Sequence, residues 1–411
     1  MHTQVAILGA GPAGLFLSHL LHLQGIDSVV IESRSRDYVE GRLRAGVLEK
    51  GTVDALVESG VGERLLREGL RHKGFNFRFG GRNHVLDLAD LADGKHVTVY
   101  GQQEVVKDLI AARIAAAGKI LFNVEAKEIC GIDTARPTIR VHQDGEEREI
   151  SCELVAGCDG FHGISRPAIP ADILKVFDRV YPFSWLGILA EAPPVSDYVT
   201  NVYHEERGFA LLSMRSRTLS RLYLQVDSNE KLEDWPDVRI WDELDRRLEG
   251  KDGLKLIRGP ILQKGITPMR SFVAEPMSYR RLFLAGDAAH IVPPTGAKGM
   301  NMAIADIRVL AVAMTDFFKT GSTRLLDAYS DTCLRRVWKV ERFSWSVTSM
   351  THNFPQDSAF DKRMRNATLD YLMSSKASGK TFAENFVGLP LEESVVTDDE
   401  RDPRTVMLKS G

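Results

Sequence analysis

Short apolar runs alternate with helical patterns near the start of the chain. The runs TQVAIL at 3–8 and SVVIE at 28–32 have the continuous apolar character of strands buried in a parallel sheet. Residues 12–24 between them have helical spacing, so this part of the chain predicts a βαβ unit. A further helix is expected over 103–117, and a longer helical segment over 45–70.

Alternating apolar and polar positions predict strands in the middle of the chain. The runs GFNFRF, HVLDL and HVTVY predict a small antiparallel ribbon near 73–100. Between about 176 and 268, strand-like runs surround one helix near 239–248, which predicts a second domain built on a sheet. The pattern becomes helical again over 299–318 and over most of 324–375.

The composition is typical of a soluble globular enzyme. Of the 411 residues 44% are hydrophobic and 27% charged, and 53 basic against 56 acidic side chains leave a net charge of −3. This balance gives no reason to expect nucleic acid or a membrane as a partner, and no apolar run approaches the roughly 20 residues of a membrane span. Four cysteines without zinc spacing favour a reducing, cytoplasmic location and no metal site.

A glycine-rich turn, GAGPAGL at 9–15, lies directly between the first predicted strand and its helix. Gly9, Gly11 and Gly14 permit a tight turn and a close approach of backbone to a pyrophosphate, which the N–H groups of the helix N-terminus can bind. Glu32, at the end of the second strand, can accept the ribose hydroxyls of an adenosine. These features predict dinucleotide binding, and the alternative is an ordinary glycine-rich turn.

A second glycine-rich turn, LAGDAAHIVPPTGAKGMN at 284–301, follows another predicted strand. Asp287 and the helix that begins near Gly299 would suit the other half of a long dinucleotide. The turn GCDGFHGISR at 157–166 also ends a strand with an aspartate. One molecule contacted by such distant segments favours FAD, although Asp287 by itself is also explained as an ordinary turn cap.

These patterns predict an α/β fold with a Rossmann-like FAD-binding domain, a β-sheet substrate domain and a helical C-terminal region. The expected boundaries are 1–175 for the FAD-binding domain, 176–268 for the substrate domain, 269–320 for a return to the FAD-binding domain, 321–390 for the helical region and 391–411 for a polar tail.

Seven segments together resemble the 4-hydroxybenzoate 3-monooxygenase family of single-component, FAD-dependent aromatic hydroxylases, over roughly residues 1–390. They are VAILGAGPAGL, GRLRAGVLE, VTVYGQ, GCDGFHGISR, FALLSMRS, LAGDAAHIVPPTGAKGMN and ENFVGLP. The resemblance implies an oxidoreductase of aromatic catabolism that uses NAD(P)H and O2. It would hydroxylate a para-substituted benzoate at the 3-position through a flavin hydroperoxide, while the protein positions the ring and excludes water.

The resemblance assigns flavin contacts to several separate segments. They are Gly9, Gly11, Ala13, Gly14 and Glu32, then Arg42, Arg44, Ala45, Gly46 and Val47, and finally Gln102, Asp287, Gly299, Met300 and Asn301.

The resemblance places the substrate carboxylate against Ser213, Met214 and Arg215, with Tyr223 beside them. A planar guanidinium pairs with a benzoate through two hydrogen bonds, although Arg215 is also explained as a surface charge on a strand. The carbonyl of Pro294 would face the para substituent.

No second glycine fingerprint is present for NAD(P)H, which the resemblance places transiently on Arg34, Arg36, Tyr38, His162 and Arg270. Ser33 stands where the family usually has a basic residue, so Arg34 and Arg36 would have to hold a 2′-phosphate. NADPH is slightly favoured, and NADH stays open.

The chain departs from the family at two tyrosines that pass the phenolic proton toward a histidine, matched here by His72. One is replaced by Phe386. The other falls where a one-residue insertion leaves Asn201 or Val202 as the match; Val202 is assigned to the site, and Tyr203 is expected to face the other way because strand side chains alternate. The proton chain is therefore predicted to be broken, and His72 is also explained as an exposed loop histidine.

A broken proton chain makes 4-aminobenzoate or 3,4-dihydroxybenzoate alternative substrates. Two other function classes stay open: a flavin oxidase or reductase without oxygen insertion, and a non-catalytic flavin-binding sensor. Ser213 and Arg215 on one strand favour the enzyme, since a buried cation needs an anionic partner. A homodimer is expected, with the aromatic-rich helices over 324–375 as its face, although such aromatics more often pack in a core.

Overall fold

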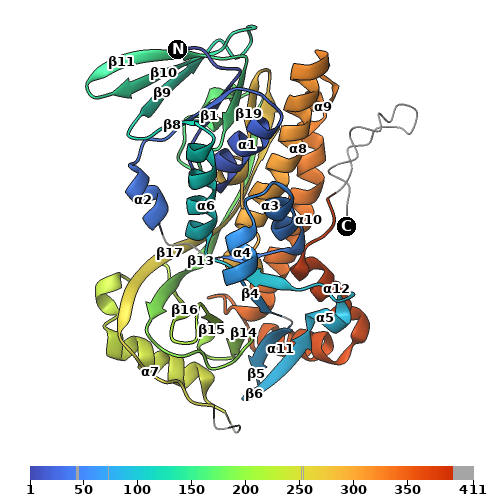
Figure 1. Ribbon diagram of the computed structural model, residues 1–411. Coiled ribbons are helices and arrows are strands. Elements are labelled where there is room, and N and C mark those ends of the chain that lie inside the picture. Colours follow the sequence, from blue (N-terminus) through green and yellow to red (C-terminus); the bar gives the residue numbers. More distant parts are fainter. Residues whose placement is uncertain (43–45, 73, 251, 253, 392–411) are drawn as a thin grey trace.

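A computed structural model describes residues 1–42, 46–72, 74–250, 252 and 254–391 (Figure 1). An upper part contains a six-stranded sheet and a lower part contains an eight-stranded sheet. The long strands β13 (Lys175–Ala190) and β17 (Ile261–Glu275) run between the two parts, and so does the long helix α10 (Tyr329–Thr351). The predicted α/β fold is confirmed.

The six-stranded sheet is built on the predicted βαβ unit. Its strands, in spatial order, are β18 (Ser278–Tyr279), β19 (Leu282–Leu284), β12 (Leu154–Gly157), β1 (Val5–Leu8), β2 (Ser28–Ile31) and β8 (Lys119–Leu121). β1 is fully buried and pairs in parallel with β2 and β12, and β12 pairs in parallel with β19. Their carboxyl ends therefore share one edge, where ligands bind in folds of this kind.

Helices α1 (Pro12–Leu23), α8 (Gly299–Thr320) and α6 (Gln102–Ala115) cover this sheet, and α1 packs on both of the others. The exposed strands β9 (Glu125–Cys130), β10 (Thr138–Gln143) and β11 (Glu146–Ser151) form a separate antiparallel sheet at the top of Figure 1. Among the described residues, no helix has both the length and the apolar character to cross a membrane.

The eight-stranded sheet contains the strand-rich middle of the chain. Its order is β20 (His290–Ile291), β17, β13, β16 (Ser220–Asp227), β15 (Gly208–Met214), β14 (Val199–His204), β5 (Gly74–Phe79) and β6 (Arg82–Asp87). One face packs against helix α7 (Asp237–Leu248) through an aliphatic cluster. The other face carries aromatic side chains and packs against α10, α11 (Ala359–Ser374) and α12 (Lys376–Val387).

The predicted ribbon near 73–100 is wrong as a separate unit. β5 and β6 do pair with each other, but parallel pairing of β5 with β14 joins both to the large sheet. The third run becomes β7 (Val97–Val99), which pairs instead with β3 (Val47–Leu48) and β4 (Leu70–His72). Alternation in the sequence identified the strands, but it carried no information on which edges they would join.

The helical segment expected over 45–70 is interrupted. It contains α3 (Lys50–Glu58) and α4 (Glu63–Glu68), and strand β4 begins at Leu70. Gly60 has a φ of +83°, a conformation that favours glycine and ends α3. Three other short α-helices are α2 (Arg36–Gly41), α5 (Leu88–Leu91) and α9 (Arg324–Asp327). Helix α12 begins at Lys376, within the helical region expected over 321–390.

Candidate functional site

The turns that follow β1, β12 and β19 touch one another at the shared edge of the upper sheet. Gly9 has a φ of +98°, and a Cβ added there would lie 2.3 Å from the carbonyl oxygen of Cys158. A Cβ added at Gly286 would lie 3.2 Å from Ala303 and 3.7 Å from Ala13. The two glycine-rich turns, far apart in sequence, therefore form one surface, as a single long dinucleotide would require.

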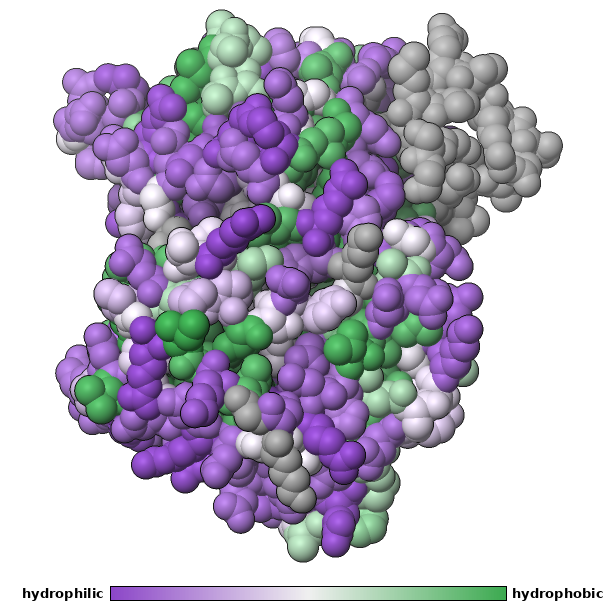
Figure 2. Space-filling view, turned by 60° about the horizontal axis from the view of Figure 1, so that its bottom comes forward, coloured by the Kyte–Doolittle hydropathy of each residue, from purple (hydrophilic) through white to green (hydrophobic). Residues whose placement is uncertain are grey.

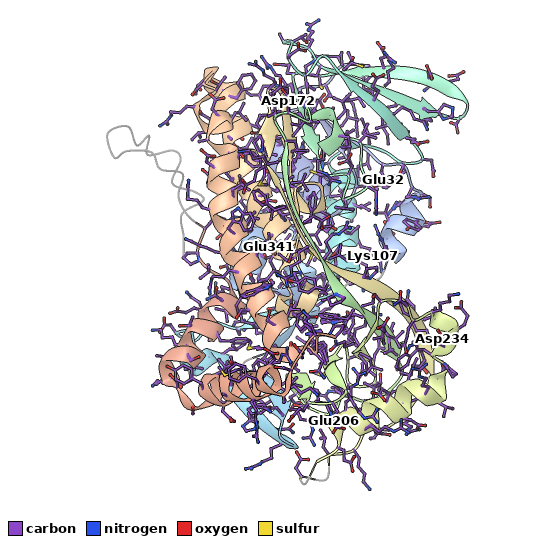
Figure 3. All side chains as sticks on the ribbon, turned by 180° about the vertical axis from the view of Figure 1, so that it is seen from behind. Glu32, Lys107, Asp172, Glu206, Asp234 and Glu341 are labelled. Atoms are coloured by element: carbon purple, nitrogen blue, oxygen red, sulfur yellow. The ribbon has the colours of Figure 1, made fainter. Side chains whose placement is uncertain are left out.

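In the first turn, backbone atoms pack closely at Gly14 and leave free space at Gly11, as a pyrophosphate site needs. A Cβ at Gly14 would lie 2.0 Å from the carbonyl oxygen of Gly9, whereas one at Gly11 would have no atom within 4 Å. Glu32, labelled in Figure 3, accepts hydrogen bonds from the backbone N–H of Ala10 (2.9 Å) and of Arg34 (2.8 Å). Its carboxylate thus lies across the turn, where an adenosine ribose would meet it, so these residues fit the predicted cofactor.

Asp159, which the sequence analysis did not select, belongs to the same surface. Its Oδ2 accepts hydrogen bonds from Ser165 N (2.9 Å) and Ser165 Oγ (2.8 Å), while its buried Oδ1 has no partner among the described residues. Burial raises the pKa of Asp159. The GCDG segment was the available signal, because an aspartate directly after a buried strand is placed at the sheet edge.

Two further predicted segments are tied together by Asn301. Its Oδ1 accepts a hydrogen bond from Glu49 N (2.9 Å), and its Nδ2 donates to the carbonyl oxygens of Val47 (2.9 Å) and Ala297 (2.8 Å). A Cβ at Gly46 would lie 2.2 Å from the Tyr100 carbonyl oxygen, so this segment also needs its glycine. The Asn301 side chain is committed to these loops, which leaves its backbone for contact with a flavin.

A buried ion-pair network links these loops to the end of α12. Lys298 Nζ donates to Glu49 Oε1 (2.6 Å) and to the carbonyl oxygens of Asn385 (2.5 Å) and Phe386 (3.0 Å). Arg336 Nη2 donates to Glu49 Oε2 (2.9 Å). Burial lowers the pKa of Lys298, although the Glu49 carboxylate opposes this shift. The network, which the sequence analysis missed, fixes Phe386 relative to the flavin-side loops.

The other predicted flavin residues lie along this surface or beside it. Asp287 is exposed on the turn after β19, Gln102 begins α6, and Gly299 and Met300 begin α8. Arg42 is exposed at the end of α2. Arg44 and Ala45 lie outside the described residues.

The predicted carboxylate anchor carries buried polar atoms without partners. Ser213 and Met214 are the last two residues of β15, and Arg215 follows directly after the strand. Neither Ser213 Oγ nor Arg215 Nη1 has a hydrogen-bond partner among the described residues, although both atoms are buried. Burial lowers the pKa of Arg215, and the neighbouring charge of Arg221 lowers it further, although Tyr223 opposes this shift. Two guanidinium groups and an unpaired hydroxyl at one place call for an anion.

Arg221, which was not predicted from the sequence, lies beside the predicted carboxylate anchor. It lies directly opposite Ser213 across the β15–β16 pair, and its Nε donates to Tyr223 Oη (3.2 Å). A Cβ at Gly187 would lie 2.9 Å from Arg221 Nη2, so this glycine leaves room for the guanidinium. The segment SMRSRTLSRLYL at 213–224 contains three arginines after Ser213, and only the register distinguishes Arg221 from the others.

Tyr223 rests on a stack of buried rings. Its ring centroid lies 4.9 Å from that of Trp185, which is stacked at 4.8 Å on Phe209. Trp185 Nε1 donates to His352 Nε2 (2.7 Å), and the His352 ring stacks on Phe209 at 4.2 Å. Burial lowers the pKa of His352 well below its usual range, so the ring is neutral and can accept this hydrogen bond. The stack holds Tyr223 in place beside the arginines.

The assignment of Val202 to the site is wrong. Val202 packs in the aliphatic cluster against α7, whereas Val199 and Tyr203 pack in the aromatic cluster that contains Phe386. Because strand side chains alternate, Asn201 lies on the face of Val199 and Tyr203. The expectation that Tyr203 faces away from this side is therefore wrong as well. The insertion hid the register, which pairing of Asn201 with Leu211 on β15 settles.

Phe386 and Pro294, both predicted for the site, lie on different elements. Phe386 is buried on α12, with its ring centroid 4.6 Å from that of Phe75, which pairs with Val199. Pro294 is exposed and begins the short helix Pro294–Gly296, which Thr295 anchors to Thr348 on α10 (2.7 Å between hydroxyls).

His72 is buried rather than an exposed loop histidine. It ends β4 with 2% of its surface exposed, and neither ring nitrogen has a hydrogen-bond partner among the described residues. Burial lowers its pKa, and the nearby Arg215 charge lowers it further, although Asp197 opposes the shift. The ring is therefore neutral and lies near the carboxylate anchor.

The residues predicted for NAD(P)H form two groups. His162 and Arg270 both meet the ring of Phe161, at 4.9 Å between ring centroids and 4.6 Å from the guanidinium carbon. Arg166, which was not selected, lies 4.7 Å over the same ring and donates to the Phe161 carbonyl oxygen (2.6 Å).

The second group lies on and beside α2. The Arg34 guanidinium stacks over Tyr38 at 5.5 Å, and Arg36 forms an exposed ion pair with Glu40 (2.6 Å). No group of histidine, cysteine, aspartate and glutamate side chains suited to a metal ion was found in the part of the chain that the structure describes.

Comparison with known proteins identifies similar chains. A model of the FAD binding domain family matches residues 2–344. The p-hydroxybenzoate hydroxylase of Acinetobacter baylyi is 48% identical over 392 residues, which cover 95% of this chain and 96% of that protein. The rifampicin monooxygenase of Streptomyces venezuelae is 24% identical, and the match covers 74% of this chain and 62% of that protein. The crystal structure of p-nitrophenol 4-monooxygenase from Pseudomonas putida shares the fold, with a TM-score of 0.81, 20% identity and coverage of 95% of this chain and 99% of that one.

Proposed function

Because the chain belongs to the p-hydroxybenzoate hydroxylase family of FAD-dependent aromatic-ring monooxygenases, we propose that it hydroxylates a para-substituted benzoate at the 3-position with NAD(P)H and O2. One observation carries the choice of a benzoate. Ser213 Oγ and Arg215 Nη1 are buried and have no hydrogen-bond partner within the described part of the chain, and Arg221 adds a second positive charge beside them. A carboxylate would satisfy all three groups at once.

The protein's own residues would orient the ring and keep water away from it. Ser213, Arg215 and Tyr223 would hold the carboxylate end, and the backbone of Pro294 would face the other end of the ring. Phe386 brings an apolar wall, fixed by the contact of Lys298 with its carbonyl oxygen. When bound, FAD would supply the redox chemistry: it takes a hydride from the nicotinamide and activates O2. Exclusion of water favours transfer of oxygen to the ring over release of peroxide.

The nicotinamide would dock transiently on the two groups around Phe161 and Tyr38. Arg34 and Arg36 are the cations available for a 2′-phosphate, because Ser33 supplies none. We favour NADPH on this basis. A comparison of KM for NADPH and NADH, in the wild type and in Arg34→Ala, tests the assignment: loss of the NADPH advantage in the variant supports it.

A homodimer is proposed from exposed apolar side chains on the C-terminal helices. Trp338 and Trp345 on α10 and Phe360 and Tyr371 on α11 are each at least 41% exposed. On the face shown in Figure 2, apolar side chains form separate patches within a mostly hydrophilic surface. Sedimentation equilibrium of the wild type and of Phe360→Ser checks this proposal.

The function is tested by a screen of para-substituted benzoates with the FAD-loaded protein. We expect 4-hydroxybenzoate to stimulate NAD(P)H oxidation and to yield the 3-hydroxylated product. 4-Aminobenzoate and 3,4-dihydroxybenzoate belong in the same screen, since Phe386 lacks a hydroxyl. Stimulated oxidation that yields only peroxide would indicate an oxidase, and no response to any benzoate would refute the proposed substrate class.

A further inference from the structure

Asn201 is a buried polar side chain for which the proposed chemistry has no role. Only 1% of its surface is exposed, and neither Oδ1 nor Nδ2 has a hydrogen-bond partner among the described residues. A buried carboxamide without partners is costly, so native structures nearly always satisfy such groups with protein, water or ligand. The described residues supply no partner for either atom of this amide, so a ligand or a water molecule is needed to satisfy both.

The position of Asn201 relative to the carboxylate anchor matches the length of a benzoate. Asn201 pairs with Leu211 on β15, and Ser213 lies two residues further along β15 on the same face. Such diagonal neighbours are roughly 7–8 Å apart, which is comparable to the span from the carboxylate to the para substituent. Tyr203, two residues beyond Asn201 and on the same face, lies too far from Ser213 for one ring to reach both.

Most side chains around Asn201 are apolar, although Tyr203, two residues along β14 on the same face, has a buried hydroxyl that also finds no hydrogen-bond partner among the described residues. The strand neighbours of Asn201 in register are Phe77 on β5 and Leu211 on β15, and Phe386 approaches the same face through Phe75. A carboxamide offers two N–H donors and one carbonyl acceptor, but it takes up no proton. An ionised substituent here would leave its charge among apolar side chains, whereas an uncharged hydroxyl or amino group could both donate to Oδ1 and accept from Nδ2.

We propose that the Asn201 carboxamide binds the para substituent of the substrate and selects an uncharged group that both donates and accepts hydrogen bonds. This inference rests on the proposed benzoate hydroxylase function. It assigns specificity to a residue of the sheet, and it explains how the para end of the ring is held in a chain where the Phe386 side chain has no polar atom. The substrate class is a 4-hydroxy- or 4-aminobenzoate bound in its neutral-substituent form.

The test measures binding to the FAD-loaded protein through the change in flavin absorbance. The ligands are 4-hydroxybenzoate, 4-aminobenzoate and 4-methylbenzoate, and the proteins are the wild type, Asn201→Leu and Thr200→Val. Thr200 is the matched control, because it is a buried polar residue on the same strand that faces the opposite side. We expect the wild type and Thr200→Val to bind the first two ligands about tenfold more tightly than 4-methylbenzoate, and Asn201→Leu to lose this ratio.

A second readout follows the ionisation of bound 4-hydroxybenzoate by its ultraviolet spectrum. We expect the spectrum of the protonated phenol in the wild type at neutral pH. A phenolate spectrum there, or an unchanged ligand ratio in Asn201→Leu, would overturn the inference. If Asn201→Leu failed to retain FAD, the ratio of affinities for 4-hydroxybenzoate and 4-methylbenzoate would be measured in Asn201→Ala instead. Failure of the wild type to bind all three ligands would instead refute the benzoate function.

Discussion

The cofactor-side turns and the substrate-side sheet are built by different means. On the cofactor side, backbone carbonyl oxygens lie 2.0–2.3 Å from where a Cβ would be at Gly9, Gly14 and Gly46. On and beside the lower sheet, the distinguishing groups are side chains with buried polar atoms that find no hydrogen-bond partner among the residues that the structure describes: Ser213, Arg215 and Asn201. The first surface is defined by backbone atoms that exclude any side chain at these glycines. The second is defined by buried polar side chains that need a hydrogen-bond partner.

This difference explains how each surface can vary. A turn closed by backbone contacts permits only glycine, because any added atom must displace a carbonyl group. A sheet face permits many side chains at each position, provided that burial and hydrogen bonding are satisfied. The two surfaces should therefore respond differently to substitution, and the predictions below compare them from the largest expected effect to the smallest.

The largest effect is expected for Gly14→Ala. The added methyl group would meet the Gly9 carbonyl oxygen at 2.0 Å, so the turn must open. We expect FAD affinity to fall by about 100-fold or more and the purified protein to be nearly colourless. The measurement is the ratio of flavin to protein absorbance. Gly41→Ala is the control, since a Cβ there meets no atom within 4 Å; equal flavin content in both variants would contradict the comparison.

Arg215→Ala should spare the cofactor and abolish tight substrate binding. Loss of a charge-assisted contact predicts a Kd for 4-hydroxybenzoate about 100-fold higher, with unchanged flavin content. Titration followed by flavin absorbance measures it. The exposed Arg217 supplies the matched variant Arg217→Ala, which should bind like the wild type. A change of less than threefold in Arg215→Ala would show that the carboxylate is held elsewhere.

Glu341 lies between the two surfaces, on α10, which packs against β17 (Figure 3). Burial raises the pKa of Glu341 to about 7, against weaker opposing effects of Ser271 and His290. A carboxyl group with a raised folded-state pKa favours the folded state at low pH, and this contribution is lost as the pH rises from about 4.5 through about 7.

We therefore expect Glu341→Gln to match the wild type in free energy of unfolding near pH 5. At pH 8 it should exceed the wild type by about 2–3 kcal/mol. Thermal unfolding at both pH values measures the difference. Substrate affinity should not change, and a stability gap that is independent of pH would refute the assignment.

The smallest effect is expected for Trp185→Phe. The variant keeps a ring beneath Tyr223 but leaves His352 Nε2 without its donor. The lost hydrogen bond of about 1 kcal/mol lies within the protein and reaches the ligand only through the position of Tyr223. We therefore expect the Kd for 4-hydroxybenzoate to rise by at most about fivefold, with no change in flavin content. Trp235→Phe removes a comparable indole N–H, which donates to Glu230 away from the site, and should leave the Kd unchanged.

The sequence by itself determined the cofactor side of this protein. Gly9, Gly11, Gly14 and Glu32 act over a short stretch, where strand, turn and helix follow one another and local spacing fixes the geometry. The second turn at 284–301 was also predicted from the sequence, because glycines and an aspartate directly after a buried strand are typical of a ligand-binding turn at the edge of such a sheet. The resemblance to the hydroxylase family, carried by the same motifs, was confirmed.

Only the tertiary structure decided which side chains share the substrate face. Choosing between Asn201 and Val202 required the strand register, since a shift of one residue exchanges the two faces of a strand. The Lys298–Glu49 pair and the Trp185–His352 hydrogen bond join residues far apart in sequence, for which no local pattern exists. The placement of β5 and β6 depended on an edge of β14 that no alternation encodes, because pairing partners are chosen by packing of the whole sheet.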